Sequence, residues 1–238
     1  MKAPLSVTVL GIDCAGAACS AAVLRDGAAL ARLSEPMSRG QAERIVPMID
    51  DVLRSAQIAP ADLGAVAVTV GPGAFTGVRI GLAAALGIAR VVGVPCIGVT
   101  VPDALASEIP VTDGARLLVA LDSRRDDPFC SLYTAGSGRW TGGEPQAVPG
   151  TPDAARSFAP EGEGALLVAG DFAARLVEMT GYGTVLESPR VPDPVHVALL
   201  GAQGLADGTA RPAEPLYLRA PDVSDPSKDR ASRNTRGQ

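Results

Sequence analysis

Apolar and polar residues alternate along the chain in blocks that predict a regular series of strands and helices. Strands are predicted where short runs rich in β-branched residues are bounded by turn residues, at 6–13, 19–24, 28–34, 65–70 and 95–99. Asp26-Gly27 predicts a hairpin turn between the second and third strands. Apolar positions recur every three or four residues over 38–56 and 76–92, which predicts two helices. We expect Ser38 to cap the first helix and Pro47 to bend it.

The second part of the chain repeats this order on a smaller scale. A strand over 116–122 ends in Asp122, as the first strand ends in Asp13, and short strands and helices alternate from there to residue 206. The order β-β-β-α-β-α-β is that of the ribonuclease-H-like fold of actin, sugar kinases and Hsp70. We therefore predict an actin-like α/β protein with two related halves of mixed β-sheet flanked by helices. The expected units are an N-terminal half over 1–108, a smaller degenerate half over 109–220, and a polar, disordered tail over 221–238.

The second helix carries a row of residues with minimal side chains. Gly73, Gly77, Gly81, Ala85 and Ala89 recur at every fourth position, so they share one side of the helix. A glycine inside a helix costs up to about 1 kcal/mol relative to alanine, so something should pack closely against this row. The rest of the helix is also apolar, which predicts burial on more than one side. We expect a sheet below the helix and a second helix or a second chain outside it.

The turn before this helix reads Gly71-Pro72-Gly73 and admits two functional interpretations. Its glycines accept backbone angles that other residues avoid, and a helix N-terminus capped by Thr76 can bind a phosphate. The turn matches neither G-K-[ST] nor G-x-G-x-x-G, and a compact strand-to-helix corner is the favoured alternative. The loop after Asp122 has no glycine, so we expect no complete nucleotide clamp and no independent ATPase activity. Candidate anion or nucleotide contacts are Asp13, Gly71, Gly73, Thr76, Arg79 and Arg124.

Composition narrows the function classes further. A net charge of −5 over 238 residues argues against a protein that binds nucleic acid chiefly through its own surface. The basic residues between Lys228 and Arg236 are interpreted as a solubilising tail, with contact to RNA phosphates as the less favoured alternative. Arg79 and Arg90 interrupt the most apolar window and no signal peptide is visible, so we expect a cytoplasmic protein without a membrane span. The four cysteines lack zinc-site spacing and His196 is the only histidine, so we expect no metal site and no catalytic residues.

Five segments resemble one known family. Residues 71–81, GPGAFTGVRIG, resemble the G-P-G-S-F-T-G-x-R-I-G signature of the bacterial TsaB (YeaZ) family. The similarity runs in register from about residue 6 to 219. Gln41 replaces the family's usual histidine, and Pro128-Phe129 replaces its usual Val-Tyr pair. The other segments that resemble family motifs are 10–13, 41–49, 121–127 and the closing PLYLR at 215–219.

The resemblance implies a non-catalytic subunit in the synthesis of threonylcarbamoyladenosine beside the anticodon of tRNA. Family members dock on the catalytic subunit TsaD through their first two helices, with TsaE as an associated ATPase, and self-associate through the same helices without the partner. The chain would then contact tRNA only indirectly, through the complex. No cofactor is expected, apart from a possible ATP or ADP bound at the subunit interface. The expected partner contacts are Gln41, Ile45, Met48, Ile49, Val52, Gly77, Val78, Gly81, Leu82, Ala85 and Ala89.

Two enzymatic alternatives remain open at this point. An actin-like, ATP-dependent phosphotransferase would use Asp13 and the Gly71–Gly73 loop. A peptidase of the M22 type would need a nucleophile–base pair or a metal, and the sequence offers only His196 as a histidine base.

Overall fold

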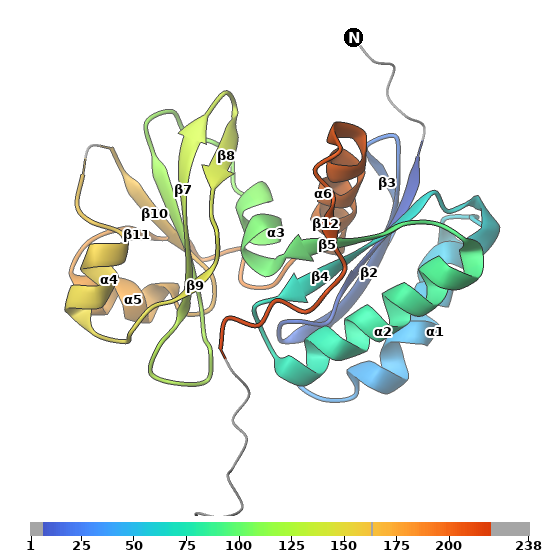
Figure 1. Cartoon of the computed structure of the whole chain (residues 1–238), viewed down its shortest axis with the longest axis horizontal. Helices are drawn as coiled ribbons and strands as arrows, with labels where there is room; N and C mark the ends of the chain where they lie inside the picture. The colour runs from blue at the N-terminus through green and yellow to red at the C-terminus, as the bar shows by residue number, and fades with distance from the viewer. Residues whose placement is uncertain (1–6, 163, 220–238) are drawn as a thin grey trace, which may run out of the picture.

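The computed structural model describes residues 7–162 and 164–219, which form two α/β halves side by side (Figure 1). The predicted tail over 221–238 lies outside the described residues. The first sheet has the strand order β12-β5-β4-β1-β2-β3, and the second has the order β11-β10-β6-β7-β8, with β9 beside β7. The elements of the first half are β1 (Thr8–Asp13), β2 (Ala18–Arg25), β3 (Ala28–Pro36), α1 (Gln41–Ser55), η1 (Pro60–Asp62), β4 (Ala65–Gly71), α2 (Phe75–Val92), β5 (Cys96–Thr100) and α3 (Val101–Ser107).

The second half follows with shorter elements. They are β6 (Arg116–Leu121), β7 (Phe129–Gly136), β8 (Arg139–Gly142), β9 (Gln146–Ala147), α4 (Pro152–Phe158), β10 (Leu166–Ala169), α5 (Ala173–Thr180), β11 (Thr184–Val185), α6 (Pro194–Asp207) and β12 (Arg211–Pro212). In both halves an antiparallel hairpin is followed by parallel crossovers: β1 pairs with β2 and with β4, and β6 pairs with β7 and with β10. The prediction of two related mixed sheets is confirmed.

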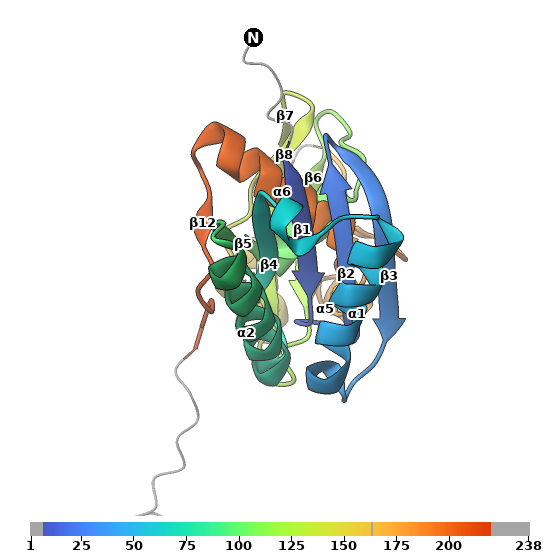
Figure 2. The same ribbon diagram turned by 90° about the vertical axis from the view of Figure 1, so that its right-hand side faces the viewer.

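Side-chain alternation along the central strands of the first sheet creates two separate cores. Leu10 and Ile12 of β1 point to the face covered by α1 and α2, whereas Val9 points to the face covered by α6. Figures 1 and 2 show α1 and α2 next to each other on one side of this sheet, with α6 on the other. All six residues of β1 are buried, as expected for a central strand with a helical layer on each face.

The C-terminal helix departs from the predicted division at residue 109. Helix α6 packs on β1 and β4, and β12 pairs with β5, so both elements belong to the first half although the sequence placed them in the second. The missing side chain of Gly11 makes this possible, because a Cβ there would lie 2.2 Å from the Pro194 carbonyl oxygen. The apolar pattern of α6 predicts that the helix is buried, but it does not predict which of the two sheets the helix packs on.

Both predicted helix caps are wrong. Helix α1 begins after Gly40, which has a φ of 91° and offers no side chain, so Ser38 is not the cap. Helix α2 begins after Ala74, and no side chain caps it, so Thr76 lies inside the first turn. Helix α3 lies between the halves and joins them, since Asp103 accepts a hydrogen bond of 2.9 Å from the Tyr133 hydroxyl of β7.

Candidate functional site

The row of small residues on α2 faces the protein's own sheet. A Cβ on Gly77 would lie 2.0 Å from the carbonyl oxygen of Cys14, and one on Gly81 would lie 3.5 Å from Val68. Ala85 and Ala89 are likewise buried. The prediction that a second subunit lies on this row is therefore wrong, because the backbone after β1 and the side chains of β4 already occupy that space.

The other residues predicted to touch a partner are also buried. They hold α1 and α2 to the sheet, since a helix beside a sheet turns its most apolar face inward. The sequence correctly predicted the two helices, but the predicted partner contacts lie on their inner faces, which pack on the sheet. The buried residues in question are Gln41, Ile45, Met48, Ile49, Val52, Val78 and Leu82.

The opposite sides of α1 and α2 expose several apolar residues, here called the outer helical face. Val91 of α2 is 88% exposed and Val46 of α1 is 59% exposed, which is unusual for large aliphatic side chains. Arg44 binds Glu35 of β3 on one side of α1, so Val46, about half a turn away around the helix, points toward α2. The outer helical face consists of Val46, Pro47, Ile80, Ala83, Ala84, Gly87 and Val91, which are exposed or half-buried.

Helix α2 is unusually apolar for a helix on the surface. By length and composition alone its 18 residues could cross a membrane, with a mean hydropathy of 1.6, which the sequence analysis did not expect. Only a third of these residues are buried. The inner face of α2 is packed on the sheet, so the apolar side chains that stay exposed to solvent lie on its outer side.

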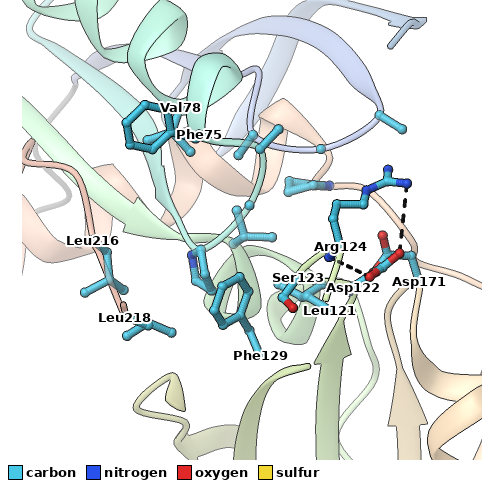
Figure 3. Close-up of a pocket in the computed structure, with 18 of the residues that line it drawn as sticks. Phe75, Val78, Leu121, Asp122, Ser123, Arg124, Phe129, Asp171, Leu216 and Leu218 are labelled. Carbon is cyan, nitrogen blue, oxygen red and sulfur yellow. Dashed lines mark hydrogen bonds and ion pairs between the residues drawn. The ribbon is translucent and has the colours of Figure 1, made fainter. Parts of the chain in front are cut away.

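A cleft of about 600 Å³ lies between the two halves, beside the N-terminus of α2. Figure 3 shows Phe75 and Val78 of α2 on one side, with Leu121, Asp122 and Arg124 across from them. Most of the lining is apolar. Polar groups gather in the loop after β6, where the Asp122 carboxylate accepts a 2.7 Å hydrogen bond from the Arg124 amide and pairs with its guanidinium.

Asp171 is a polar group of the cleft that the sequence analysis missed. Its carboxylate accepts a 2.8 Å hydrogen bond from the Asp122 amide, so it orders the start of the loop. Burial raises the pKa of Asp171, and the nearby Asp122 charge adds to this effect. Acidic and basic groups thus alternate at this wall of the cleft.

The six predicted anion contacts do not form one site. Gly73 and Arg124 line the cleft, but Thr76 and Arg79 are exposed and lie outside its lining. The Arg79 guanidinium stacks on the Phe75 ring at 3.4 Å and donates a 3.0 Å hydrogen bond to the Tyr217 hydroxyl.

Asp13 and Gly71 are buried behind the cleft wall. The Asp13 carboxylate accepts hydrogen bonds from the Thr69 hydroxyl at 2.6 Å and the Ala15 amide at 3.1 Å. Burial raises the pKa of Asp13 to about 6. Gly71 has a φ of 104° that requires glycine, and it serves the corner between β4 and α2.

A C-terminal segment, residues 216–219, ties the two halves together at the cleft. The Leu216 amide donates a 2.8 Å hydrogen bond to the carbonyl of Val70 in the first half. Arg219 pairs with Asp127 and lies 5.1 Å from the Phe129 ring in the second half. In the sequence this segment stands out only by its resemblance to a family motif, which predicts no such role for it.

A metal cluster, or a base placed beside a nucleophile, is what the peptidase alternative requires of the described residues. None of their His, Cys, Asp and Glu side chains gather in threes to bind a metal. His196 Nδ1 lies 2.8 Å from the Ser107 hydroxyl, but that hydroxyl donates its proton to the Ala104 carbonyl at 2.7 Å. His196 is therefore not placed as the base of a serine nucleophile.

Comparison with known proteins supplies the family. A family model described as TsaD, tRNA N6-adenosine threonylcarbamoyltransferase, matches residues 35–144. The Escherichia coli tRNA threonylcarbamoyladenosine biosynthesis protein TsaB is 38% identical over 142 residues, 59% of this chain and 61% of that protein. An uncharacterized protein of Mycobacterium tuberculosis is 35% identical over 218 residues, 91% of this chain and 93% of that protein. The solved YeaZ of Pseudomonas aeruginosa has a TM-score of 0.77 and 29% identity, covering 89% of this chain and 100% of that one.

The chain belongs to the TsaB (YeaZ) family. In this TsaB-family chain the signature over 71–81 has a clear mechanical role. Gly73 and Gly77 admit the carbonyl oxygens of Ala15 and Cys14, and the Ala74 amide bonds the Ala15 carbonyl at 2.8 Å. The signature therefore lets α2 pack closely on the turn between β1 and β2. In this position the outer helical face is exposed to solvent.

Proposed function

We propose that this TsaB-family chain is a non-catalytic subunit in the synthesis of N6-threonylcarbamoyladenosine in tRNA. It acts by binding a TsaD-like catalytic subunit through the outer helical face. The names of its relatives in Escherichia coli, Bacillus subtilis and Haemophilus influenzae support the pathway, and the match to the TsaD family model supports the partner. The corrected site differs from the one expected from the sequence, since it uses the outward side of the same two helices.

The exposed apolar side of α2 is the observation that carries this proposal. Gly87 lies mid-helix and a Cβ there would meet nothing within 4 Å, so no contact inside the chain requires a glycine. It shares one outward stripe with Ala83 and Val91. Small residues at such a stripe let a second helix approach closely, and burying the exposed valines contributes about 25 cal/mol per Å².

The remaining features fit an accessory role. The net charge of −5 favours contact with tRNA through the complex rather than through this chain. The loop over 122–127 lacks the glycine of a phosphate turn, which supports a subunit that does not turn over ATP by itself. The proposal also includes a TsaE-like ATPase as a further partner and ATP or ADP bound at the subunit interface. It includes a homodimer that forms through the same outer helical face. The expected location is cytoplasmic.

Co-purification with the TsaD-like protein of the same host tests the proposal. Val91→Asp places a charge in the outer helical face and should reduce recovery of the partner at least tenfold. Leu30→Asp is the matched control, because Leu30 is an exposed aliphatic residue on the edge strand β3, away from α2. Equal recovery with both variants would overturn the proposed surface.

A direct activity assay separates this proposal from the phosphotransferase alternative. The isolated chain should release no phosphate from ATP, whereas the complex with the TsaD-like and TsaE-like proteins should modify tRNA. ATP turnover by the chain alone that is lost in Asp13→Asn would favour the enzyme.

A further inference from the structure

Two cysteines face each other at the end of the first hairpin. Strands β1 and β2 pair Asp13 with Ser20, and continuing this register by one residue places Cys14 opposite Cys19. Their sulfur atoms lie 3.9 Å apart and both side chains are fully buried. The other two cysteines, Cys96 and Cys130, lie on β5 and β7. We propose that Cys14 and Cys19 are a modification site, at which a small hydroperoxide such as hydrogen peroxide forms a reversible intramolecular disulfide.

The backbone geometry brings the pair close to a bond without allowing a relaxed one. Residues directly opposite in an antiparallel pair have Cβ atoms about 4.5–5.5 Å apart. A disulfide requires about 3.8 Å between Cβ atoms and about 2.05 Å between sulfurs. The strands must therefore approach slightly when the bond forms. Such a strained disulfide is easily reduced, so the modification is expected to be reversible.

The hydrogen bond between the two thiols distinguishes their roles. Either sulfur can donate across this contact. The contact lowers the pKa of Cys19 and raises that of Cys14, which favours Cys14 as the thiol that keeps its proton. The Arg44 guanidinium also lowers the pKa of Cys19, while burial and the Asp13 carboxylate oppose this. Cys19 is therefore the attacking sulfur and Cys14 is the resolving one.

The chemistry balances with hydrogen peroxide as the sole oxidant. The Cys19 thiolate attacks one peroxide oxygen and the O–O bond breaks, which leaves a sulfenic acid on Cys19 and a hydroxide that leaves as water with the former thiol proton. The Cys14 sulfur then attacks the Cys19 sulfur. The S–S bond forms, the S–O bond breaks, and the hydroxyl group departs as water with the Cys14 proton. Two thiols and one peroxide thus give one disulfide and two waters.

The loop between the two cysteines borders the cleft, and a small oxidant would reach the buried pair by local opening of this loop. The loop over 15–17 joins the two cysteines and lines the cleft, with Gly16 half-buried and Ala17 exposed. The atoms nearest to a Cβ built on Gly16 belong to Val191 and Pro192. The carbonyls of Ala15 and Ala17 accept backbone hydrogen bonds from Ala74 and Met37, and local opening has to break these two bonds. Hydrogen peroxide is little larger than water, and local opening of this loop admits it.

Peptide mapping of the oxidised full-length chain tests the proposal. The reduced protein is treated with hydrogen peroxide, unfolded, alkylated and digested with trypsin. The peptide from Ala3 to Arg25 holds both cysteines and no other. We expect it to lose two hydrogens in mass, to resist alkylation, and to return to the dithiol form with dithiothreitol. Cys96 and Cys130 should remain alkylatable under the same conditions.

Single variants keep the proposal falsifiable. Cys14→Ser should abolish the mass loss and leave a Cys19 sulfenic acid that dimedone traps, whereas Cys96→Ser should behave like the native chain. The proposal is overturned if the peptide stays fully alkylatable, or if its only products are sulfinic acid or disulfides between chains. The measurement needs no partner, so its outcome is independent of the proposed function.

Discussion

The α-carbon of Gly77 lies against the carbonyl oxygen of Cys14, so closely that a Cβ at position 77 would come within 2.0 Å of that oxygen. This contact fixes the first turn of α2 over the end of β1. The obstacle is backbone rather than the end of a flexible side chain, so neither partner can move aside cheaply. The contact of Gly77 within the family signature is therefore a packing requirement of the chain itself.

Gly77→Ala should destabilise the isolated chain. One methyl group has to displace either α2 or the turn after β1, and overpacking of this kind costs about 1–3 kcal/mol. Urea denaturation monitored by circular dichroism measures the loss. A midpoint equal to that of the native chain would show that the contact is loose in solution.

Gly87→Ala should have the opposite effect on stability. A Cβ at position 87 meets nothing within 4 Å, so the variant gains helix propensity at no cost in packing, up to about 1 kcal/mol. Gly87→Leu should have a denaturation midpoint no lower than that of the native chain, since leucine is also a good helix former. The same variant should weaken binding of the TsaD-like partner at least about tenfold, or about 1.4 kcal/mol. Undiminished partner affinity of Gly87→Leu, measured by calorimetry, would contradict the outer helical face as the interface.

The contrast between Gly77 and Gly87 shows which features of α2 can be predicted from the sequence and which cannot. Its periodicity correctly predicted both helices and most strands, because alternation and three-to-four spacing follow directly from backbone geometry. It could not orient α2, since that helix is apolar nearly all round. Gly81 faces Val68 and Gly87 faces solvent, yet both lie in the same kind of apolar sequence.

The candidate site was less predictable for a related reason. Strand-end Asp13 and loop residue Arg124 both resemble parts of an anion site, but one is buried behind the cleft wall and the other lines the cleft. Their separation is a tertiary property. The same holds for Arg219, whose partner Asp127 belongs to the other half of the molecule and is distant in sequence.

Arg219→Ala should loosen the connection between the halves. Its guanidinium pairs with Asp127, bonds the Ser123 hydroxyl at 3.4 Å and is only 19% exposed, so its removal should cost about 1–2 kcal/mol. Hydrogen exchange of the Leu216 amide should become faster. Arg124→Ala is the control, because that side chain is 81% exposed and its removal should change stability by less than about 0.5 kcal/mol. Equal effects of the two variants would show that residues 216–219 do not fasten the halves.

Asp13→Asn should stabilise the protein above pH 6. Burial raises the pKa of Asp13 to about 6 from an ordinary value of 3.8, so the folded state binds a proton that the unfolded state releases. Stability from this group is therefore complete below about pH 4 and is lost as the pH rises through 6. A shift of about two pKa units corresponds to roughly 3 kcal/mol. Asparagine retains an oxygen for the Thr69 hydroxyl and the Ala15 amide, and its amide nitrogen replaces a carboxylate oxygen that has no partner among the described residues.

Urea denaturation of both proteins between pH 4 and pH 8 measures this effect as a difference. The difference in unfolding free energy should grow with pH across the window from 4 to 6 and then level off. Glu108 also has a pKa raised by burial, to about 7, but it titrates in both proteins and largely cancels in the difference. Glu108→Gln in both backgrounds removes its remaining contribution. A difference that stays constant from pH 4 to pH 8 would mean that Asp13 titrates as an exposed carboxylate, and that the floor of the cleft behind Ala15 is open to water.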